Sequence, residues 1–211
     1  MKFLPDEIED YAAKFSTKEE DVLAKLNRET HIKIMLPQML SGHIQGNFLK
    51  MMSHMVQAKR ILEIGTYTGY SAICLAQGLN ENGKLYTIDI NAELEDMCRR
   101  YFDEAGLNET IDFRIGNALE IIPNIDEELD IVFIDADKLN YSNYYDLVID
   151  KVRPGGFIIA DNVLWSGKVC QKEHDKDTAA LHAYNVKITE DDRVENYLVP
   201  IRDGLMVARK L

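Results

Sequence analysis

Acidic and amide side chains follow two short apolar segments of the sequence. Residues 131–134 (IVFI) lead into Asp135, and residues 157–160 (FIIA) lead into Asp161 and Asn162. Short apolar runs of this kind are typical of buried parallel strands, whose carboxyl ends face the ligand crevice of an open α/β sheet. Two carboxylates and an amide oxygen suit a hard divalent cation. The sequence therefore predicts a Mg²⁺, Ca²⁺ or Mn²⁺ site at these strand ends.

Lys138 follows Asp135 by three residues, which places both side chains on one face if a helical turn follows the strand. An amine beside a divalent cation could accept the proton of a hydroxyl group that the cation polarises. Each pair also has a simpler interpretation: Asp135 and Lys138 as a surface ion pair, and Asp161 with Asn162 as a turn or helix cap. Their shared place at two strand ends favours the cation site.

The segment LEIGTYTGYS, residues 62–71, resembles a glycine-rich nucleotide loop but lacks a full GxGxxG, because Tyr67 stands where the second close-approach glycine would be. A ligand without a pyrophosphate fits this segment better. Glu63 would favour a cationic ligand, and S-adenosylmethionine carries a sulfonium and an ammonium group. Asp89 lies 24 residues after Gly65, about the spacing at which an acid accepts hydrogen bonds from a ribose.

From residue 60 onward, strand-like and helix-like segments alternate, which predicts an α/β fold with a doubly wound, mostly parallel sheet. At most five residues, 200–204, connect the last two strands, which is too short for a parallel crossover, so the last strand must be antiparallel. A long loop is expected at 166–177. The expected strands are 60–64, 84–89, 111–115, 130–135, 156–161, 194–199 and 204–209, with helices that include 69–79, 91–105 and 141–152.

Residues 1–58 are expected to form an N-terminal helical segment, and 59–211 the core of the same single domain. Ser16 to Glu19 has the form of a capping box, which predicts a helix that begins there. A third helix is expected over 44–56. We interpret its methionine stripe, Met51, Met52 and Met55, as core packing.

The composition is that of a globular protein, with 46% hydrophobic and 28% charged residues in a chain of 211. No apolar run approaches the ~18 residues needed to span a bilayer, and the three cysteines are widely spaced, so a cytoplasmic protein with reduced thiols is expected. The net charge of -12 disfavours a broad nucleic-acid surface. A tRNA substrate is not excluded by this argument.

The chain carries four specific motifs: LEIGTYTGYS (62–71), FIDADKLNY (133–141), RPGGFIIADNVLW (153–165) and DGLMVARK (203–210). Together they resemble those of the cation-dependent O-methyltransferases, the family that holds caffeoyl-CoA and catechol O-methyltransferases and many bacterial relatives. The resemblance runs from about residue 41 to the C-terminus. One departure is Arg202, which precedes Asp203-Gly204 where bacterial relatives often have glycine.

The resemblance implies a Rossmann-like class I S-adenosylmethionine methyltransferase fold with a seven-stranded sheet and extra N-terminal helices, usually as a homodimer. It also implies a catalytic base at Lys138 and metal ligands at Asp135, Asp161 and Asn162. From its place after Asn162, Trp165 could either stack on a planar acceptor substrate or be buried under the following loop. Tyr141 is interpreted mainly as packing, and it is the tyrosine nearest to the acceptor site. The S-adenosylmethionine contacts that it implies are Glu63, Gly65, Tyr67, Ser71, Asp89, Ala118 and Asp135.

The leading hypothesis is a metal-dependent O-methyltransferase that acts on a catechol-like or hydroxycinnamoyl small molecule. The main alternative is a tRNA methyltransferase that modifies a wobble 5-hydroxyuridine, for which Lys50, Lys59 and Arg60 could supply a basic patch. An NAD-dependent oxidoreductase is opposed by Tyr67 in the glycine-rich segment. A non-catalytic nucleotide-binding module is hard to reconcile with Lys138.

Overall fold

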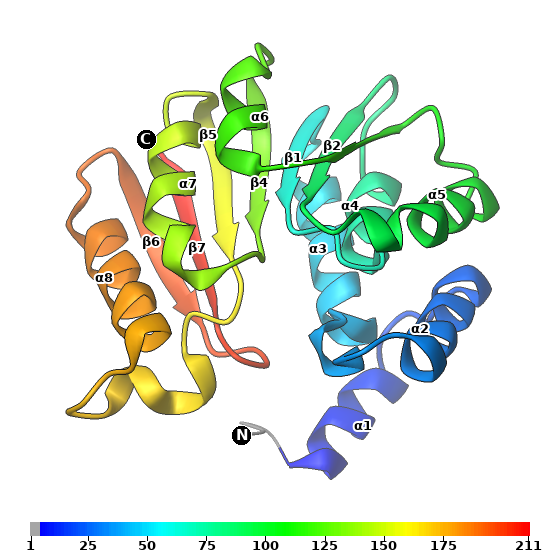
Figure 1. Cartoon of the computed structure of the whole chain (residues 1–211), viewed down its shortest axis with the longest axis horizontal. Helices are drawn as coiled ribbons and strands as arrows, with labels where there is room; N and C mark the ends of the chain where they lie inside the picture. The colour runs from blue at the N-terminus through cyan, green and yellow to red at the C-terminus, as the bar shows by residue number, and fades with distance from the viewer. Residues whose placement is uncertain (1–4) are drawn as a thin grey trace.

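The computed structural model describes residues 5–211, without the side chain of Asp6. Seven strands form one sheet in the order β3-β2-β1-β4-β5-β7-β6, and β7 runs antiparallel to both of its neighbours (Figure 1). The predicted α/β fold with an antiparallel last strand is confirmed. The strands are β1 (Arg60–Ile64), β2 (Lys84–Asp89), β3 (Ile111–Ile115), β4 (Leu129–Ile134), β5 (Val152–Ala160), β6 (Val194–Val199) and β7 (Leu205–Lys210).

Helices cover both faces of the sheet. Side chains of α2 to α5 share one apolar core with Ile61 and Phe133, while those of α6 to α8 share a second core with Leu62 and Val132 on the opposite face. Alternate residues of β1 and β4 therefore point into different cores, and complete burial of each such side chain contributes about 1.5–3 kcal/mol. The helices are α1 (Asp6–Lys14), α2 (Asp21–Lys33), α3 (Gly42–Val56), α4 (Tyr70–Gln77), α5 (Glu95–Glu104), α6 (Ala118–Ile121), α7 (Tyr141–Val148) and α8 (Lys176–Glu190).

The three central strands end at the same level. Ile64 of β1 lies opposite Ile134 of β4, and Ile134 lies opposite Ala160 of β5. The backbone pairing continues one residue further, since Asp135 N donates to Ile64 O at 2.8 Å and Asp161 N donates to Ile134 O at 2.9 Å. The carboxylates that follow β4 and β5 thus start from adjacent points at one edge of the sheet.

Helices α1 and α2 lie toward the end of the molecule to which β4 and β5 point (Figure 1). The predicted capping box is wrong. Helix α2 begins at Asp21 after Glu20, and Ser16 Oγ donates back to Ala12 O in α1 at 2.8 Å. Ser16 lies five residues before the first residue of α2, and the residue at the N-cap position, Glu20, forms no side-chain capping hydrogen bond.

The interpretation of the methionine stripe as core packing is correct for only one residue. Met52 is 8% exposed, whereas Met51 and Met55 are 56% and 64% exposed. The buried face of α3 instead carries Gln45, Gly46, Leu49, Met52 and Ser53.

Two further boundaries differ from the sequence prediction. β5 begins at Val152 rather than at 156. The sequence prediction began the strand too late because Pro154 and the two glycines after it are typical of turns, whereas here they belong to the strand. The expected loop 166–177 overlaps a 3₁₀ segment, Trp165–Cys170, which is interrupted at Ser166 and Gly167, where φ is +55° and +78°. Among residues 5–211, we find no helix that is both long enough and apolar enough to cross a membrane.

Candidate active site

Lys138 lies between the side chains that follow β4 and β5. Its Nζ donates to Asp135 Oδ1 at 3.1 Å, to Asn162 Oδ1 at 2.9 Å and to Tyr141 Oη at 2.6 Å. The Lys138 side chain is 10% exposed and that of Asp135 is 20% exposed. Three acceptors use all three N–H donors of an ammonium group. Oxygens from the ends of β4 and β5 therefore converge on one cationic atom.

Asp161 is more enclosed than Asp135 or Asn162, at 2% exposure. Its Oδ2 accepts from Gln45 Nε2 at 2.6 Å, and its Oδ1 accepts from the backbone N of Asn162 at 2.7 Å. Burial and the nearby negative charge of Asp135 raise the pKa of Asp161 above its usual value, while the bond from Gln45 opposes the rise. Two carboxylates this close to each other are stabilised by an added positive charge.

The donor set fits a hard divalent cation. Asp135 and Asn162 already direct oxygen atoms at one positive charge, that of Lys138 Nζ, and the buried carboxylate of Asp161 lies next to them. All three residues offer only oxygen ligands. Within residues 5–211, no group of three or more His, Cys, Asp or Glu side chains could hold a metal. The proposed set has only two such side chains, Asp135 and Asp161, because its third ligand is the amide oxygen of Asn162.

Glu63 lies at the carboxyl end of β1 and has no exposed surface. Burial raises the pKa of Glu63 to about 8, although hydrogen bonds from Ser71 and Thr87 oppose the rise. Thr87 Oγ1 donates to Glu63 Oε2 at 2.5 Å. In the described part of the chain, Glu63 Oε1 has no hydrogen-bond partner. This buried acceptor could take a hydrogen bond from a cationic ligand that reaches the loop after β1.

Asp89 holds the loop that follows β1. Its Oδ2 accepts from Tyr67 N at 2.6 Å, and its Oδ1 accepts from Asn91 N at 2.8 Å. Each carboxylate oxygen keeps a second lone pair for another donor. Tyr67 has φ +50°, and Gly65 has φ +100°. A Cβ on Gly65 would overlap the carbonyl oxygen of Asp135, so the loop requires glycine there.

The remaining predicted cofactor residues lie at helix starts on the same edge of the sheet. Ser71 is in the first turn of α4 and is 6% exposed, near enough to Glu63 to oppose the rise in the pKa of that carboxyl group. Ala118 begins α6 and is 7% exposed. Asn117 precedes it and caps α6, since its side chain accepts from Leu119 N. The structure thus brings the loops after β1, β2, β3 and β4 to one edge.

The two candidate substrate residues differ in exposure. Tyr141 has no exposed surface, and its hydroxyl group accepts from Lys138 and donates to Asp161 O at 3.0 Å. These contacts are those of a residue that supports Lys138. The ring of Trp165 is partly exposed, with its centroid 5.7 Å from Lys138 Nζ. Trp165 is therefore the better placed of the two to meet an acceptor.

Sequence reasoning did not identify Gln45 or Thr87 as parts of the site. Gln45 donates to Asp161 across 116 residues of sequence, a separation that no local motif reports. One signal was present: Gln45 shares the buried face of α3 with Leu49 and Met52. A polar residue in register with an apolar stripe requires a buried partner.

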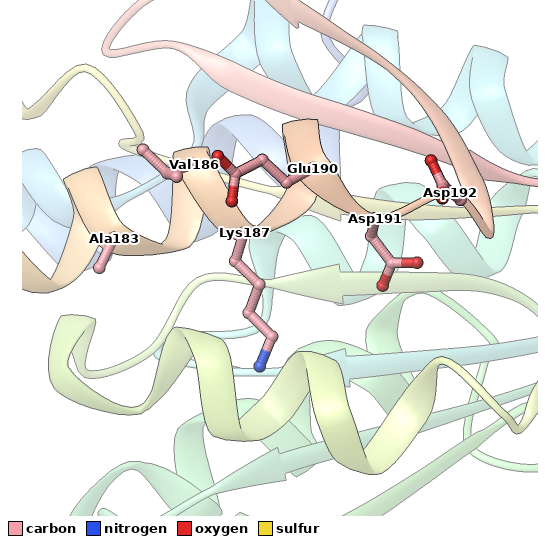
Figure 2. Close-up of a pocket in the computed structure, with 6 residues that line it drawn as sticks. All are labelled: Ala183, Val186, Lys187, Glu190, Asp191 and Asp192. Carbon is pink, nitrogen blue, oxygen red and sulfur yellow. The ribbon is translucent and has the colours of Figure 1, made fainter.

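A surface hollow elsewhere on the molecule does not belong to this site. It lies along the second half of α8 and the residues that follow it, where Lys187, Asp191 and Asp192 contribute to its wall (Figure 2). Asp191 is engaged there by Arg193 at 2.7 Å and by Tyr145 Oη at 2.8 Å. Because both partners are structural, the carboxylate of Asp191 gives no indication of a second functional site.

Comparison with known proteins gives a consistent result. The model of the O-methyltransferase family matches residues 13–211. A caffeoyl-CoA O-methyltransferase of Petroselinum crispum is 34% identical over 207 residues, which cover 92% of this chain and 86% of that protein. Caffeoyl-CoA O-methyltransferase 2 of Zea mays is 37% identical over 180 residues, which cover 79% of this chain and 68% of that protein.

Two solved structures share the fold over nearly the whole chain. The O-methyltransferase TomG of Streptomyces achromogenes, in complex with S-adenosylmethionine (SAM), has a TM-score of 0.91 at 28% identity, covering 97% of this chain and 96% of that one. An O-methyltransferase of Bacillus cereus, in complex with S-adenosylhomocysteine (SAH), has a TM-score of 0.91 at 29% identity, covering 97% of both chains.

Proposed function

Because this chain belongs to the O-methyltransferase family, we propose that it transfers the methyl group of S-adenosylmethionine to a hydroxyl group of a catechol-like or hydroxycinnamoyl small molecule. A divalent cation, Mg²⁺ in the first place and Ca²⁺ or Mn²⁺ as substitutes, would be held by Asp135, Asp161 and Asn162. The observation that carries the proposal is the convergence of Asp135 and Asn162 oxygens on the single charge of Lys138 Nζ.

The loops after β1 and β2 would bind the cofactor. Asp89 would accept hydrogen bonds from the ribose hydroxyls through the lone pairs that Tyr67 N and Asn91 N leave free. Glu63 would accept a hydrogen bond at Oε1 from the positively charged part of the ligand. The complexes of the Streptomyces and Bacillus relatives with SAM and SAH support this assignment.

Lys138 would accept the proton of the reacting hydroxyl at Nζ, since it is the basic side chain that contacts both Asp135 and Asn162. Tyr141 would hold that amine in place, because its buried hydroxyl group lies 2.6 Å from Nζ. When bound, a divalent cation supplies Lewis-acid polarisation of an acceptor with two adjacent oxygens. Fixed alignment of acceptor and methyl donor could contribute about 7–11 kcal/mol to lowering the barrier.

The charge distribution supports a small acceptor over tRNA. Lys59 and Arg60 lie at the amino end of β1, opposite the site, and Arg60 pairs with Glu127 at 3.0 Å. Lys50 pairs with Glu20 at 2.8 Å. With a net charge of -12, the chain offers little cationic surface for a phosphate backbone. The curated relatives named as caffeoyl-CoA O-methyltransferases point the same way.

Radiolabelled methyl transfer tests the proposal. The enzyme is incubated with labelled S-adenosylmethionine and Mg²⁺, in parallel with caffeic acid derivatives, simple catechols and total tRNA. We expect label in a catechol or hydroxycinnamoyl product. Label confined to tRNA would reject the small-molecule acceptor and favour modification of a hydroxylated uridine.

A further inference from the structure

Three side chains from distant parts of the chain form a continuous set of hydrogen bonds that ends at Asp161. Arg202, in the turn between β6 and β7, donates from Nη1 to Gln45 Oε1 at 3.2 Å. Gln45, in the first turn of α3, donates from Nε2 to Asp161 Oδ2 at 2.6 Å. We propose that Arg202 and Gln45 are positioning residues that fix the carboxylate of Asp161 in the orientation needed to bind a divalent cation. This inference rests on the cation site of the proposed function.

The chemistry of the three groups gives these bonds a single direction. A guanidinium group is only a donor and an ionised carboxylate is only an acceptor, whereas an amide has one end of each kind. Arg202 can therefore face only the oxygen of Gln45, which turns the NH₂ group of Gln45 toward Asp161. Without Arg202, the amide could rotate and present its oxygen to the carboxylate, which would repel Asp161.

Burial makes this orientation consequential. Gln45 has no exposed surface, and Asp161 is 2% exposed. Water is therefore poorly placed to replace a lost partner, and an unsatisfied buried polar group costs about 1–3 kcal/mol. Gln45 Nε2 and the backbone N of Asn162 engage one oxygen each of the Asp161 carboxylate. The plane of the carboxylate is thus held from both sides, and one lone pair on each oxygen stays available to a ligand.

Arg202 is itself fixed by backbone groups. It donates to Ser41 O through Nη1 and to Leu40 O at 3.1 Å through Nη2, both just before α3. The guanidinium therefore joins the start of α3 to the β6–β7 turn. Its positive charge lies close enough to Asp161 to favour the ionised form of that carboxylate.

The backbone conformation of Arg202 allows a substitution that removes its side chain without straining the turn. Its φ is +50°, in the left-handed region where glycine is favoured over other residues. Arg202→Gly removes the guanidinium without straining the turn. Gln45→Met keeps a similar volume and removes the amide. Gln171→Met, at an exposed position beyond the 3₁₀ segment, is the matched control.

The test measures Mn²⁺ affinity by electron paramagnetic resonance, with S-adenosylmethionine affinity by calorimetry and the melting temperature recorded for every variant. We expect Arg202→Gly and Gln45→Met to raise the Mn²⁺ Kd by about 10-fold to 100-fold, as is typical when the support of a metal ligand is lost. Cofactor affinity should stay within about twofold of wild type. Gln171→Met should match wild type in both affinities.

The double variant tests whether Arg202 acts through Gln45. If it does, Arg202→Gly combined with Gln45→Met should bind Mn²⁺ no more weakly than Gln45→Met alone. Additive losses would reject the relay. If Gln45→Met fails to fold, the Mn²⁺ affinity of Arg202→Gly decides the question alone.

The outcomes separate this inference from the proposed function. Wild-type Mn²⁺ affinity in both single variants, together with lost affinity in Asp161→Asn, would overturn the positioning role and leave the cation site standing. Undiminished affinity in Asp161→Asn would reject the cation site, and the positioning role with it. A fall in melting temperature with unchanged Mn²⁺ affinity would mean that Arg202 and Gln45 serve only stability.

Discussion

At the scale of single residues, Lys138 carries the largest part of the proposed chemistry. Its Nζ contacts two proposed cation ligands and a buried tyrosine, so a substitution there separates proton transfer from binding. We expect Lys138→Met to lower kcat by about 10²-fold to 10⁴-fold, the usual loss for a general base. Cofactor affinity should not change, and Mn²⁺ affinity should not fall, because the ammonium group no longer occupies Asp135 and Asn162.

Single-turnover methyl transfer, calorimetry and the melting temperature together check this expectation. Lys187→Met is a suitable control, because Lys187 forms an ion pair with Asp146 away from the strand ends. If Lys138→Met melts early yet transfers methyl groups at the normal rate per folded molecule, Lys138 is a structural residue.

Asp89 is the residue on which the cofactor assignment depends most. Asp89→Ala should weaken S-adenosylmethionine binding by about 10-fold to 150-fold, since hydrogen bonds to a charged group contribute about 1.5–3 kcal/mol. The same change also releases Tyr67 N, which Asp89 now holds at 2.6 Å. Calorimetry is the direct measurement, with Asp112→Ala on β3 as a control. Unchanged affinity in Asp89→Ala would remove Asp89 from the cofactor site.

The raised pKa of Glu63 predicts that the stability of the fold depends on pH. Its pKa of about 8 in the ligand-free fold exceeds the ordinary value of 4.5. Between these values the folded protein holds a proton that the unfolded chain has lost, so stability falls as pH rises through this window, by about 1.4 kcal/mol for each unit of pKa difference. Glu63→Gln should flatten this dependence, as melting curves from pH 5 to 9 would reveal.

The same residue gives a signature on binding. A cationic ligand beside Glu63 Oε1 favours the ionised carboxylate, so S-adenosylmethionine binding near pH 7 should release a proton. Calorimetry in two buffers of different ionisation enthalpy measures that release. Equal proton release by wild type and Glu63→Gln would show that Glu63 is not the group involved.

At the scale of elements, the site exists because β1, β4 and β5 end together. Gly65 permits this close approach, since a Cβ there would overlap the carbonyl oxygen of Asp135. We expect Gly65→Ala to destabilise the fold by at least about 1–3 kcal/mol and to weaken cofactor binding. Gly106→Ala is the matched control, because Gly106 also has a positive φ, +69°, but no atom lies within 4 Å of its added Cβ.

Melting temperatures of the two variants check this prediction. Gly106→Ala bears only the backbone cost of a positive φ, whereas Gly65→Ala also forces β1 and β4 apart. Each kcal/mol shifts the melting temperature by about 2–4 °C in a chain of this size. Equal shifts in both variants would contradict the importance of contact between the two strand ends.

Sequence patterns predicted the elements that are governed by local apolar runs. Both ends of β1, β2 and β3 were correct to the residue, because buried parallel strands have a clear apolar pattern. The start of β5 was missed, since Pro154 and its neighbouring glycines resemble a turn. Asp135, Lys138 and Asn162 were predicted to lie together from their places at strand ends and a three-residue spacing, and Lys138 contacts the other two. Gln45 was not, because its contact with Asp161 depends on how α3 packs.

At the scale of the whole molecule, charge and position favour a small acceptor. Acidic groups gather at the carboxyl edge of the sheet, while Lys59 and Arg60 lie at the opposite end of β1. The expected homodimer stays a prediction. Exposed apolar side chains between α2 and α3, namely Met35 at 85%, Leu36 at 56% and Met39 at 53%, are a surface that a second copy could cover.

The central claim is that methyl transfer depends on a cation held by Asp135, Asp161 and Asn162. The most direct measurement is the rate of labelled methyl transfer to a catechol or hydroxycinnamoyl acceptor in excess EDTA, followed by addition of Mg²⁺. We predict that activity disappears with the chelator, returns with Mg²⁺, and does not return in Asp161→Asn at the same Mg²⁺ concentration. Full turnover in excess EDTA would contradict the account and leave the three oxygen-bearing residues with structural roles alone.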